Sequence, residues 1–437
     1  MQIEDLYKKF LETNKITTDT RSDVSGSMFF ALKGTNFDAN KFAINAINKG
    51  AKYAIVDDKA LPKNDHLIFV SDSLKTLQEL AKYHRKNLKL PIIGITGSNG
   101  KTTTKELLDI VLKKKFRNFS THGNLNNHIG LPLSILQITK KHEIAVLEIG
   151  ANHKGENEFL TNICQPDIGL TTNIGKDHLG EFGGFKGVIE AYKEFTDYFI
   201  GKNDKLFFLN NDDTKLINLC KNVKTIRFGK CNLPADICGK IVEKSFPLKI
   251  IISNNSKYYK FENFKINTNF FGNYNIYNVL ATVSIALHFK LTTAQIKQAI
   301  ESYIPKNNRS EIISWGSNKI ILDAYNANPT SMQSVIKDFA ELKQKNKIVI
   351  LGSMFELGKY SESEHKEIID LLKTLSFINI ILVGKGFEAF KDLIKCNFFQ
   401  NSIDLRKWLQ KQNFNNNYFL VKGSRGEKLE KSFIGLK

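Results

Sequence analysis

The sequence predicts an α/β protein of three domains: a small N-terminal α/β domain, a central domain with a mostly parallel, doubly wound sheet, and a second, C-terminal α/β unit. Three observations support this prediction. The chain has 437 residues, about three times the length of a typical domain. From about residue 90 onward, apolar segments that suit buried strands alternate with helical patterns. One of these apolar segments runs directly into a glycine-rich loop.

The predicted domains span residues 1–88, 89–305 and 306–437. The first mixes short strands (MFFAL, YAIVD, LIFV) with the helical stretch LKTLQELAKYHRKNL. In the second, the apolar strands PIIGIT, EIAVLEIG, DIGLTTNIG and KLFFLN each precede a turn, a β-hairpin pattern covers about 225–270, and a helix runs from Asn275 through His288. The third contains the strands KIILDAY, KIVILG, INIILVG and NYFLVKG between helical patterns.

Composition favours a soluble cytoplasmic protein. Hydrophobic residues make up 42% and charged residues 24% of the chain. We find no apolar run of about 18 residues and no secretory leader pattern. The 5 cysteines form no CxxC pair, so we expect reduced thiols.

The formal net charge of +19 raises the question of a nucleic-acid partner. The lysines are scattered along the chain, however, and the densest run, Lys113 to Lys115, falls in a predicted helix tail. A lysine-rich composition, or attraction of a small anionic substrate, therefore explains the charge better than nucleic-acid binding.

The stretch GITGSNGKTTTKE predicts a phosphate-binding loop between a strand and an amphipathic helix. The loop comprises Gly97, Ser98, Asn99, Gly100, Lys101, Thr102 and Thr103. Its glycines let backbone N–H groups face phosphate oxygens, and the helix N-terminus adds a positive dipole. Lys101 can bridge terminal phosphates, and Thr102 or Thr103 can offer a hydroxyl to Mg²⁺. Ile95 breaks the strict Walker spacing, so a structural glycine turn remains the alternative.

Two further strand ends carry candidate metal ligands. Glu148 ends the strand AVLEIG, and His178 follows the strand TTNIG. Ligands collect beyond the carboxyl ends of strands in open α/β sheets, and a carboxylate with an imidazole suits Mg²⁺ beside a triphosphate. Either residue could alternatively be an ordinary polar strand terminus.

The segment THGNLNNHIGLPL is rich in asparagine. Asn124, Asn126 and Asn127 supply both donors and acceptors, which suits a peptide or sugar substrate, whereas a simple turn cluster is the alternative. We assign no role to His122 or His128.

Several motifs in order resemble the Mur ligase family. They are TGSNGKTTTKE, GNLNNHIGLPL, LEIGANHKGE, GNYNIYNVLA, LDAYNANPTSM, GSMFELG and LVKGSR, and the match runs from TTDTR to KGSR, nearly the whole chain. The YNANP stretch favours the members that attach D-alanyl-D-alanine over the sister ligases that add the third stem residue and over folylpolyglutamate synthases.

The resemblance implies an N-terminal domain that binds the UDP of the substrate, a central P-loop-type ATPase and a C-terminal Rossmann-like ligase domain. It implies ATP-dependent joining of D-alanyl-D-alanine to UDP-N-acetylmuramoyl-tripeptide through an acyl phosphate, with Lys101, His178 and Lys193 acting in catalysis and two Mg²⁺ ions bound. Thr102, Glu148 and His178 would hold Mg²⁺. ATP would also contact Asn278, Arg309 and Asp323. The substrates would lie near Thr20, Arg21, Ser22, Asn124, Asn126, Asn127, Asn326, Asn328, Lys422, Ser424 and Arg425.

The chain departs from the family pattern at three positions. The family's lysine, which CO₂ carbamylates to create an extra metal-binding carboxylate, is replaced by Tyr192, and a lysine follows as Lys193. We expect the carbamate, if it forms, on Lys193; a step of one residue turns a helix by about 100°. Ser353 stands where aspartate is usual and Tyr274 where histidine is usual.

The alternatives are another Mur-type amino acid ligase, a phosphotransferase that uses the same loop, a basic nucleic-acid-binding NTPase, and a family member that binds nucleotide without catalysis. A kinase needs no second α/β domain carrying Arg309 and Asp323, and we find no basic and aromatic stripe for nucleic acid. We expect a monomer. The sequence leaves open whether the third stem residue is diaminopimelate or lysine.

Overall fold

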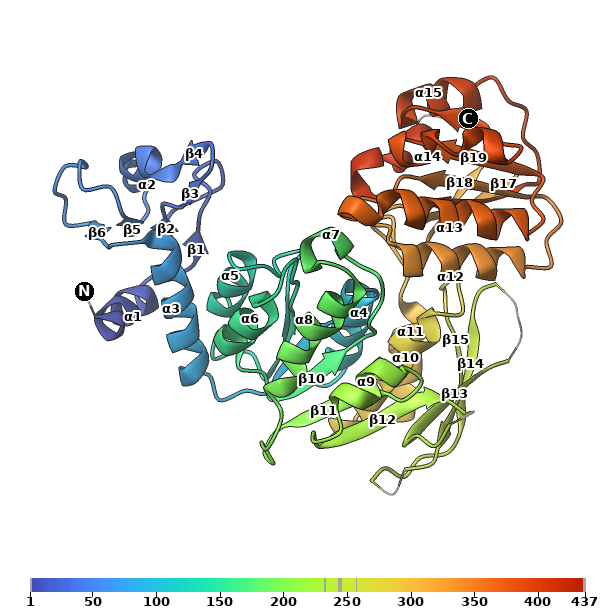
Figure 1. Ribbon diagram of the computed structural model, residues 1–437. Helices are drawn as coiled ribbons and strands as arrows, with labels where there is room; N and C mark the ends of the chain where they lie inside the picture. Colours follow the sequence, from blue (N-terminus) through green and yellow to red (C-terminus); the bar gives the residue numbers. More distant parts are fainter. Residues whose placement is uncertain (1, 232, 243–245, 257, 435–437) are drawn as a thin grey trace. The chain divides into compact units, whose positions relative to one another are not determined.

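The computed structural model describes residues 2–231, 233–242, 246–256 and 258–434 (Figure 1). The chain divides into two compact units. The first comprises residues 1–95, 116–151 and 155–169, and the second comprises residues 96–115, 152–154 and 170–437.

The N-terminal part of the first unit is built on a small parallel sheet with the strand order β1-β2-β5-β6. Its elements are α1 (Ile3–Leu11), β1 (Ile16–Thr17), β2 (Met28–Phe30), β3 (Lys33–Gly34), β4 (Phe37–Asp38), η1 (Ala39–Phe42), α2 (Ala43–Asn48), β5 (Tyr53–Val56), β6 (Leu67–Phe69) and α3 (Ser73–Asn87). Asp72 caps α3 by accepting the Lys75 N–H, and Leu77, Leu80 and Ala81 give this helix its buried face. The predicted helix in this segment is therefore confirmed.

The rest of the first unit carries the strands β7 (Ile92–Thr96), β9 (Ile144–Glu148) and β8 (Asn118–Ser120), with helices α5 (Gly130–Leu136) and α6 (Glu156–Cys164). The three strands are parallel, in the order β7-β9-β8, and β7 and β9 are buried along their whole length. Burial on both faces explains why these strands are continuous apolar runs. The register sets Glu148 opposite Ile95, just before the chain enters the glycine-rich loop.

The second unit continues with α4 (Lys101–Leu112) and the strands β10 to β15. The elements are β10 (Ile168–Thr171), α7 (Leu179–Phe182), α8 (Phe185–Asp197), β11 (Leu206–Asn210), α9 (Thr214–Leu219), β12 (Thr225–Lys230), β13 (Ile237–Ile241), β14 (Lys249–Asn254), β15 (Phe264–Asn267), α10 (Asn275–His288) and α11 (Thr293–Ser302). The prediction of hairpins from about residue 225 was partly wrong, because β12 pairs in parallel with both β11 and β13. Among the described residues of this segment, the antiparallel pairs are β13 with β14 and β14 with β15.

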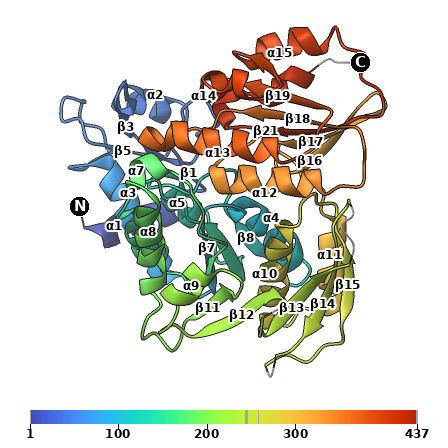
Figure 2. The same ribbon diagram turned by 45° about the vertical axis from the view of Figure 1, so that its right-hand side comes forward.

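Helices α10 and α11 lie against α4 (Figure 2). α10 has the bounds that the sequence predicts, and it is buried nearly all round because its sequence, NIYNVLATVSIALH, is apolar on every side. The polar residues Asn275 and Asn278 at its first turn are also buried. These two side chains must therefore find partners inside the protein.

The C-terminal part of the second unit is built on a six-stranded sheet with the order β16-β17-β21-β18-β19-β20. Its elements are β16 (Glu311–Trp315), β17 (Asn318–Asp323), α12 (Pro329–Ala340), β18 (Lys347–Gly352), η2 (Gly358–Tyr360), α13 (Ser361–Lys373), β19 (Asn379–Val383), α14 (Lys385–Glu388), η3 (Lys391–Leu393), β20 (Asn397–Phe399), α15 (Ser402–Leu409), β21 (Tyr418–Lys422), η4 (Arg425–Glu427) and η5 (Leu429–Phe433). All pairings are parallel except that of β16 with β17. Figure 1 shows α12 and α13 on one side of this sheet and α15 on the other. The register pairs Asp323 with Lys422 at the carboxyl ends of β17 and β21.

The three main sheets fall within the three segments predicted from the sequence. The domain boundaries themselves stay predictions. All 5 cysteines are free in the structure. Among the helices of the described residues, none has the length and apolar character that crossing a membrane requires.

Candidate nucleotide and ligase site

The loop between β7 and α4 has the backbone of a phosphate-binding loop. Gly97 has φ +128° and Gly100, which precedes α4, has φ +83°, conformations that residues with a Cβ rarely adopt. A Cβ at Gly97 would also come within 2.8 Å of the Thr172 backbone nitrogen. The loop therefore needs glycine at both positions, and it leads into the N-terminus of a helix, where anions are favoured.

The segment after β10 holds this loop in place. The Asn173 carbonyl accepts the Ser98 N–H at 3.0 Å, and the Asn173 Oδ1 accepts the Asn99 N–H at 3.1 Å. The Asn99 carbonyl in turn accepts the Thr172 hydroxyl at 2.6 Å and the Asn173 Nδ2 at 2.8 Å. These bonds fix the loop backbone before any ligand binds.

The predicted phosphate-binding side chains lie at the start of α4. The Lys101 ammonium donates to the Gly97 carbonyl and reaches the Ser98 carbonyl at 3.5 Å, so it curls over the loop. Thr102 is buried and Thr103 is half-buried. This places a cation and two hydroxyls at one helix N-terminus, as the sequence predicts.

Asn278 links α10 to the same helix. Its Oδ1 accepts the Thr104 hydroxyl at 3.1 Å, and its Nδ2 donates to the Asn275 Oδ1 at 2.8 Å. A Cβ added at Gly100 would collide with the Asn278 amide. Asn278 therefore lies directly against the loop.

His178 begins α7 in the left-handed conformation, with φ +45°. Its Nδ1 lies 3.1 Å from Glu356 Oε2, and the Glu356 carbonyl accepts the Gly180 N–H at 3.2 Å. The segment GSMFELG therefore contacts the predicted metal ligand through Glu356.

In the first unit, Glu148 is buried and is held by the asparagine-rich segment. Its Oε1 accepts the Asn126 Nδ2 at 2.8 Å, and its N–H donates to the Thr121 hydroxyl at 3.0 Å. Asn127 Oδ1 accepts the Gly130 N–H at 2.8 Å, next to the start of α5. Asn124 is exposed in the same segment. Asn126 therefore orients a predicted metal ligand, and Asn127 has a local structural partner.

Thr20, Arg21 and Ser22 form a turn in the N-terminal part of the first unit. The Arg21 guanidinium donates to Asp19 at 2.8 Å, and these hydrogen bonds lower the pKa of the Asp19 carboxyl to about 2. Ser22 Oγ donates to the Asp19 carbonyl at 2.9 Å, and the Thr20 carbonyl accepts the Lys49 ammonium at 2.9 Å. The exposed Arg21 side chain is thus held on this turn by Asp19.

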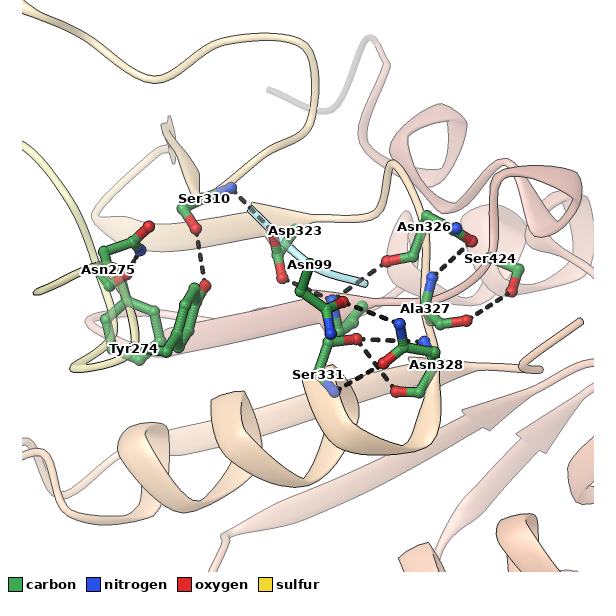
Figure 3. Close-up of polar contacts among 12 residues, drawn as sticks. Asn99, Tyr274, Asn275, Ser310, Asp323, Asn326, Ala327, Asn328, Ser331 and Ser424 are labelled. Carbon is green, nitrogen blue, oxygen red and sulfur yellow. Dashed lines mark hydrogen bonds and ion pairs between the residues drawn. The ribbon is translucent and has the colours of Figure 1, made fainter. Parts of the chain in front are cut away.

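In the C-terminal sheet, Asp323 and Lys422 form a buried ion pair of 2.7 Å. Asp323 Oδ1 also accepts the Ser310 N–H at 3.0 Å, and the Ser310 hydroxyl lies 2.8 Å from the Tyr274 hydroxyl (Figure 3). Burial, and after it the negative charge of Asp323, raises the pKa of Tyr274. Tyr274 therefore stays protonated and joins the start of α10 to the Asp323 site.

The other predicted residues of this part surround the turn after β17. The Arg309 guanidinium lies 3.6 Å and the Arg425 guanidinium 5.8 Å from the centre of the Tyr325 ring. Asn326 is exposed and its carbonyl accepts the Lys422 ammonium at 3.2 Å. This turn thus brings two guanidinium groups to one exposed edge of the site.

Asn328 caps α12, and Ser424 is bonded to Ala327, the residue before Asn328 (Figure 3). Asn328 Oδ1 accepts the Ser331 N–H at 2.9 Å, which leaves its Nδ2 to donate to Asn99 Oδ1 at 2.9 Å. Ser424 Oγ donates to the Ala327 carbonyl at 3.4 Å. Asn328 therefore connects the C-terminal sheet with the phosphate loop.

The Lys193 side chain points into solvent from α8. Its ammonium lies 2.5 Å from Asp197, one turn along α8, and its side chain is 55% exposed. The inward position belongs to Tyr192, whose hydroxyl donates to Asp177 Oδ2 at 2.7 Å. The 100° step between neighbouring helix positions accounts for the difference.

Sequence reasoning missed Asp177, Tyr192, Thr172 and Asn173 as parts of the site. Thr172 and Asn173 could have been found, because they are polar residues directly after a buried strand. Within the described residues there is no group of three or more His, Cys, Asp or Glu side chains that could hold a metal ion.

Protein-family models and known enzymes match the segments of the chain that carry these residues. The family models of the Mur ligase middle domain and of the Mur ligase, glutamate ligase domain match residues 95–286 and 308–425. UDP-N-acetylmuramoyl-tripeptide–D-alanyl-D-alanine ligase of Bacillus subtilis is 32% identical over 95% of this chain and 91% of its own length.

Solved structures are similar over the same length. A crystal structure of MurF from Acinetobacter baumannii has a TM-score of 0.86 and 29% identity, covering 100% of this chain and 98% of its own. MurF ligase from Thermotoga maritima, solved in complex with ADP, has a TM-score of 0.84 and 27% identity, covering 97% of this chain and 96% of its own. The likeness therefore extends over both the nucleotide site and the C-terminal sheet.

Proposed function

Because the chain belongs to the Mur ligase family, we propose that it joins D-alanyl-D-alanine to UDP-N-acetylmuramoyl-tripeptide, with ATP converted to ADP and phosphate. The observation that carries the proposal is the hydrogen bond between Asn99 of the phosphate loop and Asn328, which belongs to the YNANP stretch. It links a nucleotide-binding loop with the segment that favours the dipeptide-adding members. ATP use is further supported by the ADP bound to the similar ligase from Thermotoga maritima.

The chemistry follows from the poor reactivity of a carboxylate toward an amine. The terminal carboxylate of the tripeptide attacks the γ-phosphorus of ATP, and ADP leaves. The amine of the dipeptide then attacks the acyl phosphate and loses a proton, an amide bond forms, and phosphate leaves. Closure around the acyl phosphate would exclude water and prevent its hydrolysis.

The nucleotide would lie on the loop from Gly97 to Thr103. The N–H groups and the Lys101 ammonium would bind its phosphates, because they converge on the N-terminus of α4. Asn278 would meet the adenine. Arg309 and Asp323 would reach the nucleotide from the C-terminal sheet, and Lys101 would stabilise the charge of the transferring phosphoryl group.

Mg²⁺ fits the chemistry of the predicted donors. Thr102 offers a hydroxyl and Glu148 a carboxylate, both of which Mg²⁺ prefers, and His178 supplies an imidazole. An ATP-bound Mg²⁺ takes most of its ligands from phosphates and water, so a small protein set is sufficient. Two ions, when bound, would neutralise charge on the transferring phosphoryl oxygens. Asn126 and Glu356 would orient Glu148 and His178.

Lys193 remains the proposed carrier of a carbamate. The family pattern predicts that Lys193→Ala loses most activity and recovers part of it with formate or acetate. Its ion pair with Asp197 would have to open before CO₂ could react with the neutral amine. Full activity of the variant would assign the role to another group.

The UDP moiety would lie near Thr20, Arg21 and Ser22, where Arg21 is exposed. The tripeptide would meet the segment with Asn124, Asn126 and Asn127, and the dipeptide would lie near Asn326, Asn328, Lys422, Ser424 and Arg425. The third stem residue stays open between diaminopimelate and lysine. We expect the protein to act in the cytoplasm as a monomer.

The proposed function is tested by assays in which one substrate at a time is left out. Purified protein is expected to release phosphate from ATP only when both UDP-N-acetylmuramoyl-tripeptide and D-alanyl-D-alanine are present. Equal release without the dipeptide would favour a phosphotransferase or a hydrolase. Activity with a single amino acid in place of the dipeptide would indicate another Mur-type ligase. Parallel assays with diaminopimelate-containing and lysine-containing tripeptides identify the third residue.

A further inference from the structure

A buried chain of hydrogen bonds runs from α8 to the phosphate loop. The Tyr192 hydroxyl donates to Asp177 Oδ2 at 2.7 Å, and the Ser98 hydroxyl donates to Asp177 Oδ1 at 2.5 Å. Ser98 Oγ also accepts the Gly175 N–H at 2.8 Å. One carboxylate therefore joins a helix side chain to a side chain of the phosphate loop.

All three side chains have little freedom. Tyr192 is 2% and Asp177 5% exposed, and Ser98 is half-buried. An unpaired carboxylate at this depth would be costly, which ties the orientation of Asp177 to both hydroxyls.

We propose that Tyr192 is a positioning residue for the phosphate loop, acting through Asp177 and Ser98. Tyr192 fixes the Asp177 carboxylate, and Asp177 holds the Ser98 hydroxyl between itself and the Gly175 N–H. Ser98 then has one orientation, with its N–H on the Asn173 carbonyl. The loop is thereby preorganised for phosphate, which lowers the cost of binding nucleotide.

This inference rests on the proposed function only for the identity of the nucleotide. It predicts that Tyr192→Phe, which removes one hydroxyl and keeps the ring, weakens nucleotide binding about fivefold to tenfold, the effect expected from the loss of one ordinary hydrogen bond. KM for ATP should rise by a similar factor, while KM for D-alanyl-D-alanine stays unchanged.

Tyr303→Phe is the matched control. The Tyr303 hydroxyl donates to Glu106 Oε2 at 2.5 Å, so this variant also removes a tyrosine–carboxylate hydrogen bond, and Glu106 lies on α4 beyond the loop. Titration of both variants and the unaltered protein with fluorescent ADP gives the affinities, and thermal unfolding gives their stabilities. An affinity loss in Tyr192→Phe no larger than that in Tyr303→Phe would overturn the proposal.

A double-mutant cycle tests whether Tyr192 acts on the loop through Ser98. If Tyr192 acts through Ser98, the effects of Tyr192→Phe and Ser98→Ala on ADP affinity are not additive, whereas additive losses would contradict the route. Should Tyr192→Phe fail to fold, Asp177→Asn replaces it in the same cycle. Unaltered protein that binds no ADP would overturn the nucleotide site and with it the proposed function, so the two failures are distinguishable.

Discussion

The Nδ2 of Asn328 donates to the Oδ1 of Asn99 at 2.9 Å, so the residue that caps α12 also holds the phosphate loop. The two roles use different atoms of one amide, because the Asn328 Oδ1 accepts the Ser331 N–H. This division allows the cap and the contact with the loop to be tested separately.

Asn328→Asp should keep the helix cap and lose the contact. Aspartate caps helices as well as asparagine does, but its second oxygen would face Asn99 Oδ1 without a proton to donate. We expect KM for ATP to rise about fivefold to tenfold while the thermal unfolding midpoint changes little. Steady-state kinetics and calorimetry measure the two quantities. An unchanged KM would mean that the Asn99–Asn328 bond does not support nucleotide binding.

Lys101→Ala should abolish most activity and leave the fold intact. The ammonium contacts loop carbonyls in the described structure. In the proposed mechanism its charge would stabilise the γ-phosphoryl group as it moves. We expect kcat to fall about a hundredfold or more, measured as phosphate release with both substrates present. A circular dichroism spectrum like that of the unaltered protein is the control. Activity within twofold of the unaltered protein would exclude Lys101 from phosphoryl transfer.

Lys422→Met should destabilise the protein, because it leaves the Asp323 carboxylate without its buried counter-ion. The Lys422 side chain is 3% and that of Asp323 16% exposed. Breaking such a pair costs about 3 kcal/mol of unfolding free energy, measured by urea denaturation. Lys366→Met is the matched control: it also removes a 2.7 Å pair, with Asp370, but on the surface. Equal stability of the two variants would contradict this account of the pair.

Stability should fall as the pH drops below about 6.5, because His84 and His365 are buried as neutral groups. Burial lowers the pKa of both side chains. The unfolded chain then binds more protons than the native one below the unfolded pKa, which favours unfolding. The hydrogen bonds of His365 also require a neutral ring. Its Nε2 accepts the Met354 N–H at 3.0 Å, so a proton on Nε2 would break this bond.

Urea denaturation at pH 7.5 and at pH 5.5 measures this change in unfolding free energy. Both pH values lie above the range in which most carboxylates titrate. His365→Gln should show a smaller loss between the two pH values than the unaltered protein. A stability that is equal at both pH values, or higher at pH 5.5, would contradict the assignment of neutral buried histidines.

The sequence predicted the resemblance to the Mur ligases and the three α/β segments, and both are confirmed. Periodic apolar patterns made this possible: α10 has the predicted bounds because its run is long and continuous. Strand pairing was harder to predict in the segment from residue 225. Short apolar strands have similar sequences whether the neighbouring strand is parallel or antiparallel.

Individual side-chain roles were less predictable than elements. Nothing local shows that Tyr192 points inward and Lys193 outward, because the choice depends on how α8 packs. Asp177 escaped notice because its partners, Ser98 and Tyr192, are distant in sequence. The roles assigned to Glu148 and His178 remain predictions.

The most direct test of the central claim is transfer of ¹⁸O from the tripeptide. The substrate would carry ¹⁸O at both oxygens of its terminal carboxylate, and the phosphate released during ligation would be analysed by mass spectrometry. An acyl phosphate requires that one carboxylate oxygen leave with the phosphate, so the account predicts one ¹⁸O atom in each phosphate and a product extended by D-alanyl-D-alanine. Phosphate that contains no ¹⁸O while this product accumulates would contradict it.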